Sequence, residues 1–400
     1  MSPRLYNTAS RQVEPFTPRG ETVGLYVCGV TPYDTTHMGH AFTYVVFDTL
    51  ARMLRRAGWP VTYVQNVTDI DDDILKRARE TGKRWDELGR EQTAQYETDT
   101  RALNIDPPTH FLRATDEIDQ MIPLIATLIA KGHAYTAGGN VYFSVASDLE
   151  YGSLSRYSRE EMCAIAAERG GNIDDPNKRD PLDFLLWQGA RPGEPSWPSP
   201  WGAGRPGWHI ECSAMAMHFL GPTVDIHGGG ADLVFPHHES EIAQSECATG
   251  VHPFVRVWMH TAMVRYRGEK MSKSLGNMVF VRDALTQYNP DAIRLYLLNH
   301  HYRTSWEYED DGPAAFLTLI KQVTDTLAWP DGSGATLDAG PFVAAFDRAL
   351  ESDLDTPAAI AAFRSLATAA NDARGRSLAE SHAALRAMAG TLGLRVGQPS

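Results

Sequence analysis

The segment from residue 23 to residue 67 decides the fold. It reads VGLYVCGV (Val23–Val30), a TPYDTT turn, HMGHAFTYVVFDTLARMLRRAG (His37–Gly58) and VTYVQNV (Val61–Val67). The first and last pieces are short apolar runs rich in Val, which is typical of buried strands. The middle piece has apolar residues at helical spacing and ends on a glycine, which predicts a helix. Strand, helix and strand in succession make a βαβ unit, so we predict an α/β fold with a parallel sheet and nucleotide chemistry at its strand ends.

The rest of the chain suggests further units. Residues 76–131 are predicted to be mostly helical, and the chain then becomes rich in Pro, Gly and Trp. We expect a first half of the α/β core (1–134), an inserted connective segment (135–204), a second half of the core (205–305) and a C-terminal helical domain (306–400). The breaker WPDGSGATLDAGP interrupts that last domain.

Composition limits the classes of function. The chain has 37 basic and 50 acidic side chains and a net charge of −13, which argues against a broad basic surface for nucleic acid but leaves a local basic groove possible. An apolar fraction of 43% excludes global disorder. Four cysteines are too few for a disulfide framework, and neither a signal peptide nor an apolar run of about 18 residues is present. We therefore expect a cytoplasmic protein with no membrane partner.

Two motifs point to phosphate chemistry. His37, Gly39 and His40 open the predicted helix, where imidazoles, the helix dipole and a close backbone suit an anionic phosphate. Lys270-Met271-Ser272-Lys273-Ser274 carries two lysines that could stabilise charge on a departing pyrophosphate. Alone, the first would be ordinary cap or surface histidines and the second a solvated basic loop. Together, HxGH and KMSKS are the signature of class I aminoacyl-tRNA synthetases and their relatives.

A third set suggests soft-metal chemistry. Cys28 lies on the first predicted strand, Cys212 lies in WHIEC, and His237 and Glu241 are spaced to share one face of a helix. Two thiolates, an imidazole and a carboxylate make a credible tetrahedral Zn²⁺ set. The alternative is that the cysteines are buried small hydrophobic residues, because no CxxC spacing is present.

Several longer stretches resemble one superfamily. YVCGVTPYD, THMGHA, NVTDIDD, GRPGWHIECSAM, DIHGGGADLVFPHHESEIAQSE, EKMSKSLGN and LLNHHYR together are similar to the class I cysteinyl-tRNA synthetases and their offshoot, the mycothiol cysteine ligases. The latter join cysteine to the amine of glucosaminyl-inositol. The resemblance covers roughly residues 4 to 310 and implies a Rossmann-like class I catalytic core, which is the doubly wound α/β type.

The resemblance implies roles for particular residues. It implies one Zn²⁺ per chain, held by Cys28, Cys212, His237 and Glu241, that binds the substrate thiol as thiolate and so discriminates against serine. Mg²⁺ would accompany ATP, and the reaction would give cysteinyl-AMP. The implied ATP-binding residues are His37, Gly39, His40, Lys270, Met271 and Lys273, of which His37, His40, Lys270 and Lys273 would be catalytic. The implied residues for cysteine or its adenylate are Cys28, Gly29, Thr31, Thr43, Asn66, Thr68, Trp208, Gly230 and Asp232.

The acceptor is less certain from the sequence. ERGGNIDDP (168–176), HHYRTSWEYED (300–310), Phe42 in place of the synthetase Arg and the absence of a visible anticodon-binding domain resemble the mycothiol ligases. Glu241, the DIHGGG stretch and GEKMSKSLGN are closer to the synthetases. We favour glucosaminyl-inositol as acceptor, hence a role in mycothiol biosynthesis. The alternatives are the acceptor end of tRNA-Cys and a non-catalytic paralogue that binds cysteine or nucleotide.

Overall fold

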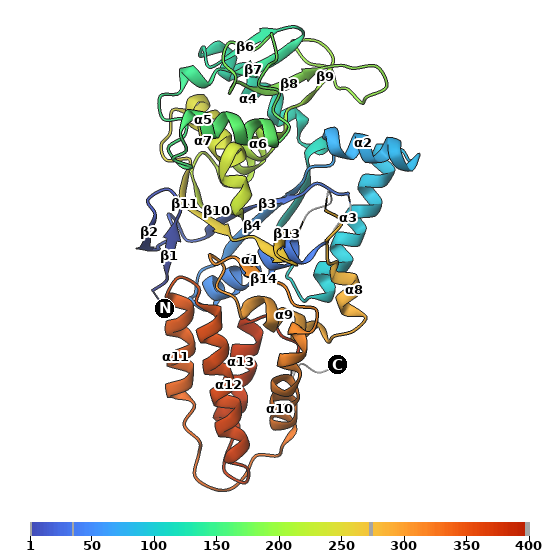
Figure 1. The fold of residues 1–400 in the computed structure, drawn as a ribbon. Helices are drawn as coiled ribbons and strands as arrows, with labels where there is room; N and C mark the ends of the chain where they lie inside the picture. The colour runs from blue at the N-terminus through green and yellow to red at the C-terminus, as the bar shows by residue number, and fades with distance from the viewer. Residues whose placement is uncertain (1, 34–35, 272–274, 397–400) are drawn as a thin grey trace.

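A computed structural model of the chain describes residues 2–33, 36–271 and 275–396. A parallel sheet occupies the middle of the molecule, an antiparallel sheet lies beyond one end of it, and a bundle of C-terminal helices lies beyond the other (Figure 1). In this described part of the chain, no helix is both long and apolar enough to cross a membrane.

The central sheet has five strands in the order β11-β10-β3-β4-β5, and every neighbouring pair is parallel. Its strands are β3 (Val23–Val30), β4 (Val61–Val67), β5 (His110–Arg113), β10 (Val224–Gly230) and β11 (Val255–Thr261). The predicted βαβ unit is confirmed, with α1 (Met38–Arg56) joining β3 to β4. Parallel strands end at one edge of a sheet, so the residues that follow β3, β4 and β10 come together there.

The predicted helical region contains one strand that the sequence pattern did not reveal. Its helices are α2 (Asp72–Thr81), α3 (Trp85–Ala102) and α4 (Ile118–Ala130), and β5 lies between the last two. β5 has four residues and pairs with β4 from Val64↔His110 to Val67↔Arg113. A run this short has no readable period, so pairing with β4 decides its conformation.

The inserted segment forms a four-stranded antiparallel sheet in the order β6-β7-β8-β9. Its strands are β6 (Ala134–Ala137), β7 (Asn140–Phe143), β8 (Phe184–Gly189) and β9 (Gly204–Pro206). Helix α5 (Arg159–Glu168) lies between β7 and β8 and starts with a capping box formed by Ser158 and Glu161. After β9 come α6 (Trp208–Leu220) and, beyond β10, α7 (Glu239–Thr249), and these two helices contact each other.

The C-terminal part is helical, as predicted. Its helices are α10 (Leu317–Ala328), α11 (Gly340–Glu351), α12 (Thr356–Asp372) and α13 (Ala379–Thr391), preceded by α8 (Val281–Leu285) and α9 (Pro290–Leu298). The predicted breaker separates α10 from α11. Short pairings complete the fold: β1 (Arg4–Asn7) with β2 (Gln12–Pro15), and β12 (Val264–Tyr266) with β13 (Glu269–Lys270) and β14 (Trp306–Glu307).

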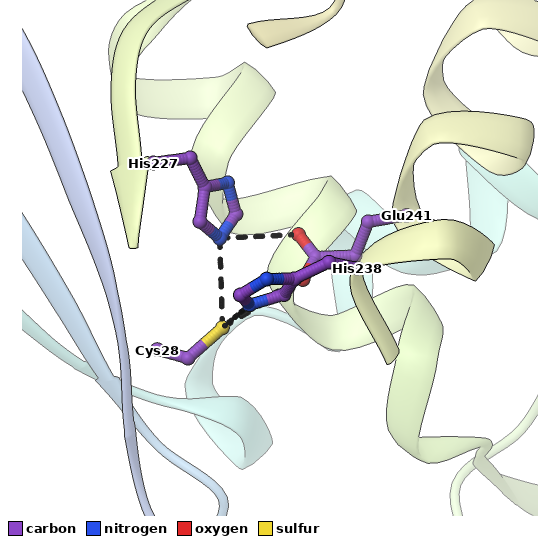
Figure 2. A group of neighbouring side chains, drawn as sticks. All are labelled: Cys28, His227, His238 and Glu241. Carbon is purple, nitrogen blue, oxygen red and sulfur yellow. Dashed lines mark hydrogen bonds and ion pairs between the residues drawn. The ribbon is translucent and has the colours of Figure 1, made fainter. Parts of the chain in front are cut away.

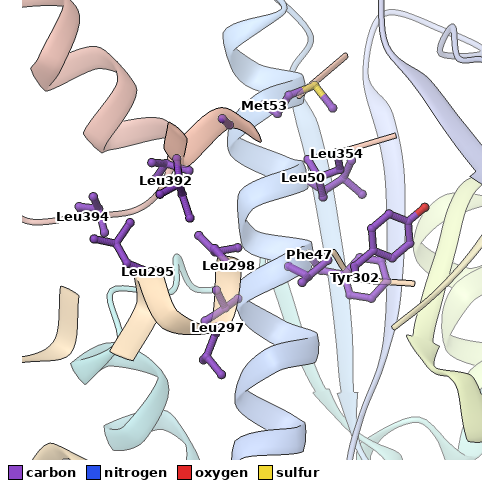
Figure 3. Close-up of a cluster of buried hydrophobic side chains, with 14 of the residues drawn as sticks. Phe47, Leu50, Met53, Leu295, Leu297, Leu298, Tyr302, Leu354, Leu392 and Leu394 are labelled. Atoms are coloured by element: carbon purple, nitrogen blue, oxygen red, sulfur yellow. The ribbon is translucent and has the colours of Figure 1, made fainter. Parts of the chain in front are cut away.

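One hydrophobic cluster joins the core to the helices. Phe47 and Leu50 of α1 contribute to it together with Leu298 of α9 and Leu392 at the end of α13 (Figure 3). Next to it the fully buried Arg294 of α9 pairs with Asp48 of α1 and also donates to the carbonyl oxygens of Leu392 and, at 3.1 Å, Leu103. The C-terminal helices are therefore fixed to the catalytic core by both packing and charge.

Candidate active site and metal centre

A group of buried Cys, His and Glu side chains lies beside the carboxyl end of the sheet. Cys28 is near the end of β3 and Cys212 is in α6, while His237 and Glu241 lie where the chain enters α7. His237 Nε2 is 3.2 Å from Glu241 Oε1, so the two side chains meet as their spacing predicted. None of the four is more than 5% exposed.

The four residues fit a tetrahedral zinc ion. Their donor atoms all lie within 4.8 Å of one another. Zinc bond lengths place two thiolate sulfurs about 3.8 Å apart and a sulfur about 3.5 Å from a nitrogen or oxygen on a regular tetrahedron. Cys28 Sγ lies 3.8 Å from Cys212 Sγ and 3.6 Å from Glu241 Oε1. Donor chemistry and donor spacing therefore agree.

Burial sets the protonation of this group. It raises the pKa of the Cys28 thiol and of the Glu241 carboxyl well above their ordinary values, and the nearby Cys212 adds to both shifts. Burial also lowers the pKa of His237, with the neighbouring His209 adding to the effect. Burial therefore favours the protonated forms of Cys28 and Glu241, and a metal ion that binds them must displace those protons.

The residues around His237 hold its ring in place. Its Nδ1 atom lies 2.9 Å from Nδ1 of His209. This hydrogen bond orients the ring so that the other nitrogen, Nε2, faces Glu241. Trp208, at the start of α6, stacks on the same ring with centroids 4.3 Å apart. The predicted cysteine-pocket residue Trp208 therefore lies directly against the candidate metal centre.

A second set of donors shares two members with the first. His227 of β10 and His238 join Cys28 and Glu241 in another group whose donor atoms lie within 4.8 Å (Figure 2). Both histidines are fully buried, and burial lowers the pKa of each well below its ordinary value. Neither histidine was predicted to be a site residue. The signal was present in the strand DIHGGG and in the doubled His of FPHHE, but spacing alone does not show that they converge.

A hydrogen-bonded chain runs along the strand ends next to Cys28. Gly29 N donates to Asn66 Oδ1 (2.8 Å), Asn66 Nδ2 to Thr68 Oγ1 (3.2 Å), and Thr68 Oγ1 to Glu211 Oε2 (2.9 Å). A Cβ at Gly29 would lie 1.5 Å from the Asn66 carbonyl oxygen, so this close approach requires glycine. Glu211 was not predicted. It is fully buried, and burial raises its pKa well above the ordinary value.

The HMGH motif begins α1 as predicted. His37 caps the helix, because its Nδ1 accepts from the backbone N–H groups of Gly39 (3.1 Å) and His40 (3.3 Å). The His37 and His40 rings stack with centroids 3.7 Å apart. The backbone also meets the segment that follows KMSKS, since Met38 N donates to Val279 O (2.9 Å) and Val281 N to Thr36 O (2.9 Å). The start of α1 is therefore adjacent to residues 279–281, which follow the KMSKS motif in the chain.

The ERGG segment at the end of α5 also reaches this region. Glu168 Oε1 lies 3.4 Å from Lys270 Nζ, and Arg169 donates to the carbonyl oxygen of Asp232 at 2.7 Å. Met271 is buried. Lys273 lies outside the described residues.

The remaining predicted site residues lie near the strand ends. Thr43 in α1 contacts Thr261 at the end of β11 (Oγ1–Oγ1 2.7 Å). Thr31 follows β3, and Gly230 ends β10.

The HHYRTSWEYED segment serves to connect the domains. Tyr302 Oη and Arg303 Nε each donate to Asp353 at 2.6 Å, in the loop between α11 and α12. Trp306 packs edge-on against Phe42, with centroids 5.5 Å apart. Phe42, which follows GHA, and Trp306 both belong to stretches that resemble the mycothiol ligases, and the two side chains contact each other in the structure.

Comparison with known families agrees with this geometry. Residues 15–314 match the family described as tRNA synthetases class I (C) catalytic domain. The chain belongs to this family. It is accordingly an ATP-dependent ligase of the cysteinyl-tRNA synthetase family. Residues 345–396 match the DALR domain, which the sequence analysis described only as helices.

Curated relatives of this family carry two different names. The chain is 46% identical over 403 residues to the cysteine--tRNA ligase of Alkalilimnicola ehrlichii, covering 99% of this chain and 86% of the relative. It is also 46% identical over 369 residues to the L-cysteine:1D-myo-inositol 2-amino-2-deoxy-alpha-D-glucopyranoside ligase of Thermobispora bispora, covering 92% of this chain and 90% of the relative. Identity alone does not separate the two.

Solved class I synthetases share the fold. The chain resembles the leucyl-tRNA synthetase LeuRS from Agrobacterium radiobacter K84, with a TM-score of 0.65, 14% identity and coverage of 94% of this chain and 84% of that one. It also resembles Mycobacterium tuberculosis methionyl-tRNA synthetase, with a TM-score of 0.63, 16% identity and coverage of 94% and 90%. These likenesses concern the fold.

Proposed function

We propose that the protein activates L-cysteine with ATP to give cysteinyl-AMP and pyrophosphate, and that it then transfers the cysteinyl group to an amine with release of AMP. The observation that carries this proposal is the buried set Cys28, Cys212, His237 and Glu241 beside α1, whose Tyr44 hydroxyl donates to the carbonyl oxygen of Cys28. Zn²⁺ held by these residues would bind a thiol as thiolate and a hydroxyl poorly, which favours cysteine over serine.

The neighbouring residues then orient the substrates. Trp208 covers the His237 ring and forms one side of the cysteine pocket, and Asn66 and Thr68 form another at the ends of the strands. The carboxylate of cysteine would attack the α-phosphate of ATP, and His37 and His40 would hold the phosphates of Mg²⁺-ATP. Lys270 is held by Glu168 in this structure, so the ATP phosphates would compete with that carboxylate for its ammonium group.

The acceptor that we favour is glucosaminyl-inositol. The ERGG segment supports this, because Glu168 and Arg169 are polar side chains next to Lys270 and the end of β10. Carboxylate and guanidinium groups hydrogen bond readily to the hydroxyls of a sugar. The T. bispora relative, whose name specifies an aminosugar acceptor, adds support.

The second candidate is cysteine--tRNA ligase. The A. ehrlichii relative aligns over 99% of this chain, whereas the T. bispora relative aligns over 92%.

Cysteine activation is tested by exchange of labelled pyrophosphate into ATP. We expect exchange that depends on cysteine and is much weaker with serine. Absence of exchange in the full-length, zinc-loaded protein would refute activation, whichever acceptor is used.

The acceptor is tested by competition. The protein is given radiolabelled cysteine, ATP and equal concentrations of tRNA-Cys and glucosaminyl-inositol, and the products are separated. We expect the cysteinyl amide of the aminosugar. Cysteinyl-tRNA without amide would refute this choice and support the alternative.

A variant pair locates the acceptor. Arg169→Gln should slow transfer to the aminosugar by about 10- to 100-fold, the value of one charge-assisted hydrogen bond, while pyrophosphate exchange persists. Arg159→Gln, at the other end of α5, is the matched control and should change neither rate. Equal transfer by the two variants would remove Arg169 from the acceptor site.

A further inference from the structure

The hydrogen bonds along the strand ends next to Cys28 form a chain that runs in one direction. The backbone N–H of Gly29 donates to Asn66 Oδ1 at 2.8 Å, and Asn66 Nδ2 donates to Thr68 Oγ1 at 3.2 Å. Thr68 Oγ1 in turn donates to Glu211 Oε2 at 2.9 Å. The chain starts at the residue that follows Cys28 and ends in α6, so it connects two of the elements that carry the candidate metal ligands.

The first hydrogen bond fixes the direction of the other two. A backbone N–H can only donate, so the side-chain oxygen of Asn66 faces Gly29 and its amide nitrogen faces Thr68. An amide nitrogen also only donates, so the Thr68 hydroxyl accepts there and uses its single hydrogen for Glu211. Glu211 Oε2 can accept that hydrogen whether or not Oε1 carries a proton, so the direction does not depend on the charge of the carboxyl group.

The Thr68 hydroxyl is therefore left with the capacity to accept one more hydrogen bond and none to donate. A hydroxyl oxygen has two lone pairs, and Asn66 uses one of them. Within the residues that the structure describes, no other group forms a hydrogen bond with Thr68 Oγ1. A ligand that reaches this oxygen must therefore be a donor.

Glu211 has no other polar contact that explains its position. It is fully buried in α6, and in the described part of the chain its Oε1 atom has no hydrogen-bond partner. No cationic side chain of that part pairs with it. A buried carboxyl group with a single hydrogen bond destabilises the folded state relative to an apolar side chain of similar size. This cost points to a use in the site, and Thr68 is the contact through which it acts.

Cysteine has one strong donor group that suits such an acceptor. Its carboxylate and a zinc-bound thiolate only accept, whereas its α-ammonium group only donates. Thr68 directly follows β4, which pairs with the strand that carries Cys28, so an amino acid whose sulfur lies at the metal centre has its ammonium group near these strand ends. A hydroxyl without a free hydrogen also leaves the substrate carboxylate unbound, and that carboxylate must stay free to attack ATP.

We propose that Glu211 is a positioning residue that takes the hydrogen of Thr68, so that the Thr68 hydroxyl accepts a hydrogen bond from the α-ammonium group of the amino acid. The pocket then selects amino acids over thiol acids that have no amino group. This inference rests on the proposed activation of cysteine and identifies the group of the substrate that these strand ends recognise.

The experiment compares cysteine with 3-mercaptopropionate, which has the same thiol and carboxylate but no amino group. Exchange of labelled pyrophosphate into ATP by the full-length, zinc-loaded protein gives the KM of cysteine and the Ki of 3-mercaptopropionate as a competitor. The ratio of Ki to KM isolates the amino group, because the two compounds share their other contacts. We expect a wild-type ratio of at least about 10, the value of one charge-assisted hydrogen bond.

Variants assign the ratio to Glu211. Glu211→Met keeps the length of the side chain and removes the acceptor, so the Thr68 hydrogen is free to face the ligand. It should lower the ratio by about 10-fold, mainly through the KM of cysteine, while Glu211→Gln, which keeps an oxygen for Thr68, should retain the ratio. Thr68→Val should lower the ratio as well, and adding Glu211→Met to it should lower the ratio no further.

The matched control makes the same change in another helix. Glu246 in α7 accepts from the backbone N–H of Phe254 at 2.7 Å and lies outside the chain that ends at Glu211. Glu246→Met should keep the wild-type ratio.

The outcomes separate this inference from the proposed function. A wild-type protein without cysteine-dependent exchange would refute both. Exchange by the wild type together with an unchanged ratio in Glu211→Met would refute the role of Glu211 alone, and so would an equal loss of affinity for the two compounds or an equally low ratio in Glu211→Gln. Bound zinc and circular dichroism are measured for each variant. If Glu211→Met fails to fold, Thr68→Val decides: a lowered ratio supports the inference, and an unchanged one overturns it.

Discussion

Replacement of Cys212 by serine tests the metal centre most directly. The Cys212 sulfur is 3.8 Å from that of Cys28 and supplies one of four donors in the first set. A serine hydroxyl keeps its proton and is a poor ligand for zinc. Structural zinc sites with four ligands bind with about 10–16 kcal/mol, so an equal share for one ligand is about 2.5–4 kcal/mol. We therefore expect Cys212→Ser to raise the zinc Kd by a few hundred-fold.

The assay is competition with a chromophoric chelator at several pH values. Because burial raises the pKa of Cys28 and of Glu241, zinc must displace their protons, and affinity should fall as the pH falls. Cys163→Ser makes the same chemical change outside both donor sets and should leave the Kd unchanged. Equal zinc affinity in the two variants would refute the ligand assignment, and with it the proposed basis of selection against serine.

Three further predictions concern stability. Burial raises the pKa of Asp71 from 3.8 to about 6, so the charged form of Asp71 destabilises the folded protein as the pH rises through that range. Asp71→Asn keeps the oxygen that caps α2 and removes the charge. It should raise the free energy of unfolding, measured with urea, by about 1–2 kcal/mol at pH 8 and by little at pH 4. Arg294→Met removes the cation that pairs with the buried Asp48 carboxylate and should lower the free energy of unfolding by about 3–5 kcal/mol in the same assay. A decrease of less than about 1 kcal/mol would contradict the coupling of the C-terminal helices to the core. Gly29→Ala places a Cβ 1.5 Å from the Asn66 carbonyl oxygen and should lower the free energy of unfolding by about 3 kcal/mol or more. If the variant unfolds at the Tm of the wild-type protein, that close approach is refuted.

Patterns local in the chain predicted much of the fold. The two Val-rich strands and the helix between them have clear periods of their own, and β3, β4 and α1 formed as expected. β5 did not follow from the pattern because four residues carry no period, and its pairing with β4 decides its conformation. Helix α5, whose capping box is visible in the letters SREE, was overlooked in a segment dominated by Pro and Gly.

The sequence likewise predicted some contacts of the candidate site and missed others. His237 and Glu241 are close in the chain, so helical spacing predicted their contact. His227 could not be placed with them, because it reaches Cys28 only through the pairing of β10 with β3. For the HHYRTSWEYED segment, the sequence suggested a functional role, and the structure shows packing contacts between domains. It carries a resemblance to one branch of the family, yet its side chains bind Asp353 and pack on Phe42 at the junction of the domains.

The sequence by itself determined the family chemistry of this protein: a parallel α/β core, the HMGH and KMSKS motifs, and a thiol, imidazole and carboxylate set suited to zinc. Those features are short-range patterns or residue identities, and they need no knowledge of distant contacts. The tertiary structure alone decided which distant groups share a site. It placed ERGG beside Lys270, joined the start of the HMGH helix to residues 279–281 through backbone hydrogen bonds, and directed two further histidines at Cys28. Such convergence depends on strand order and helix packing, which act over separations that no local period records.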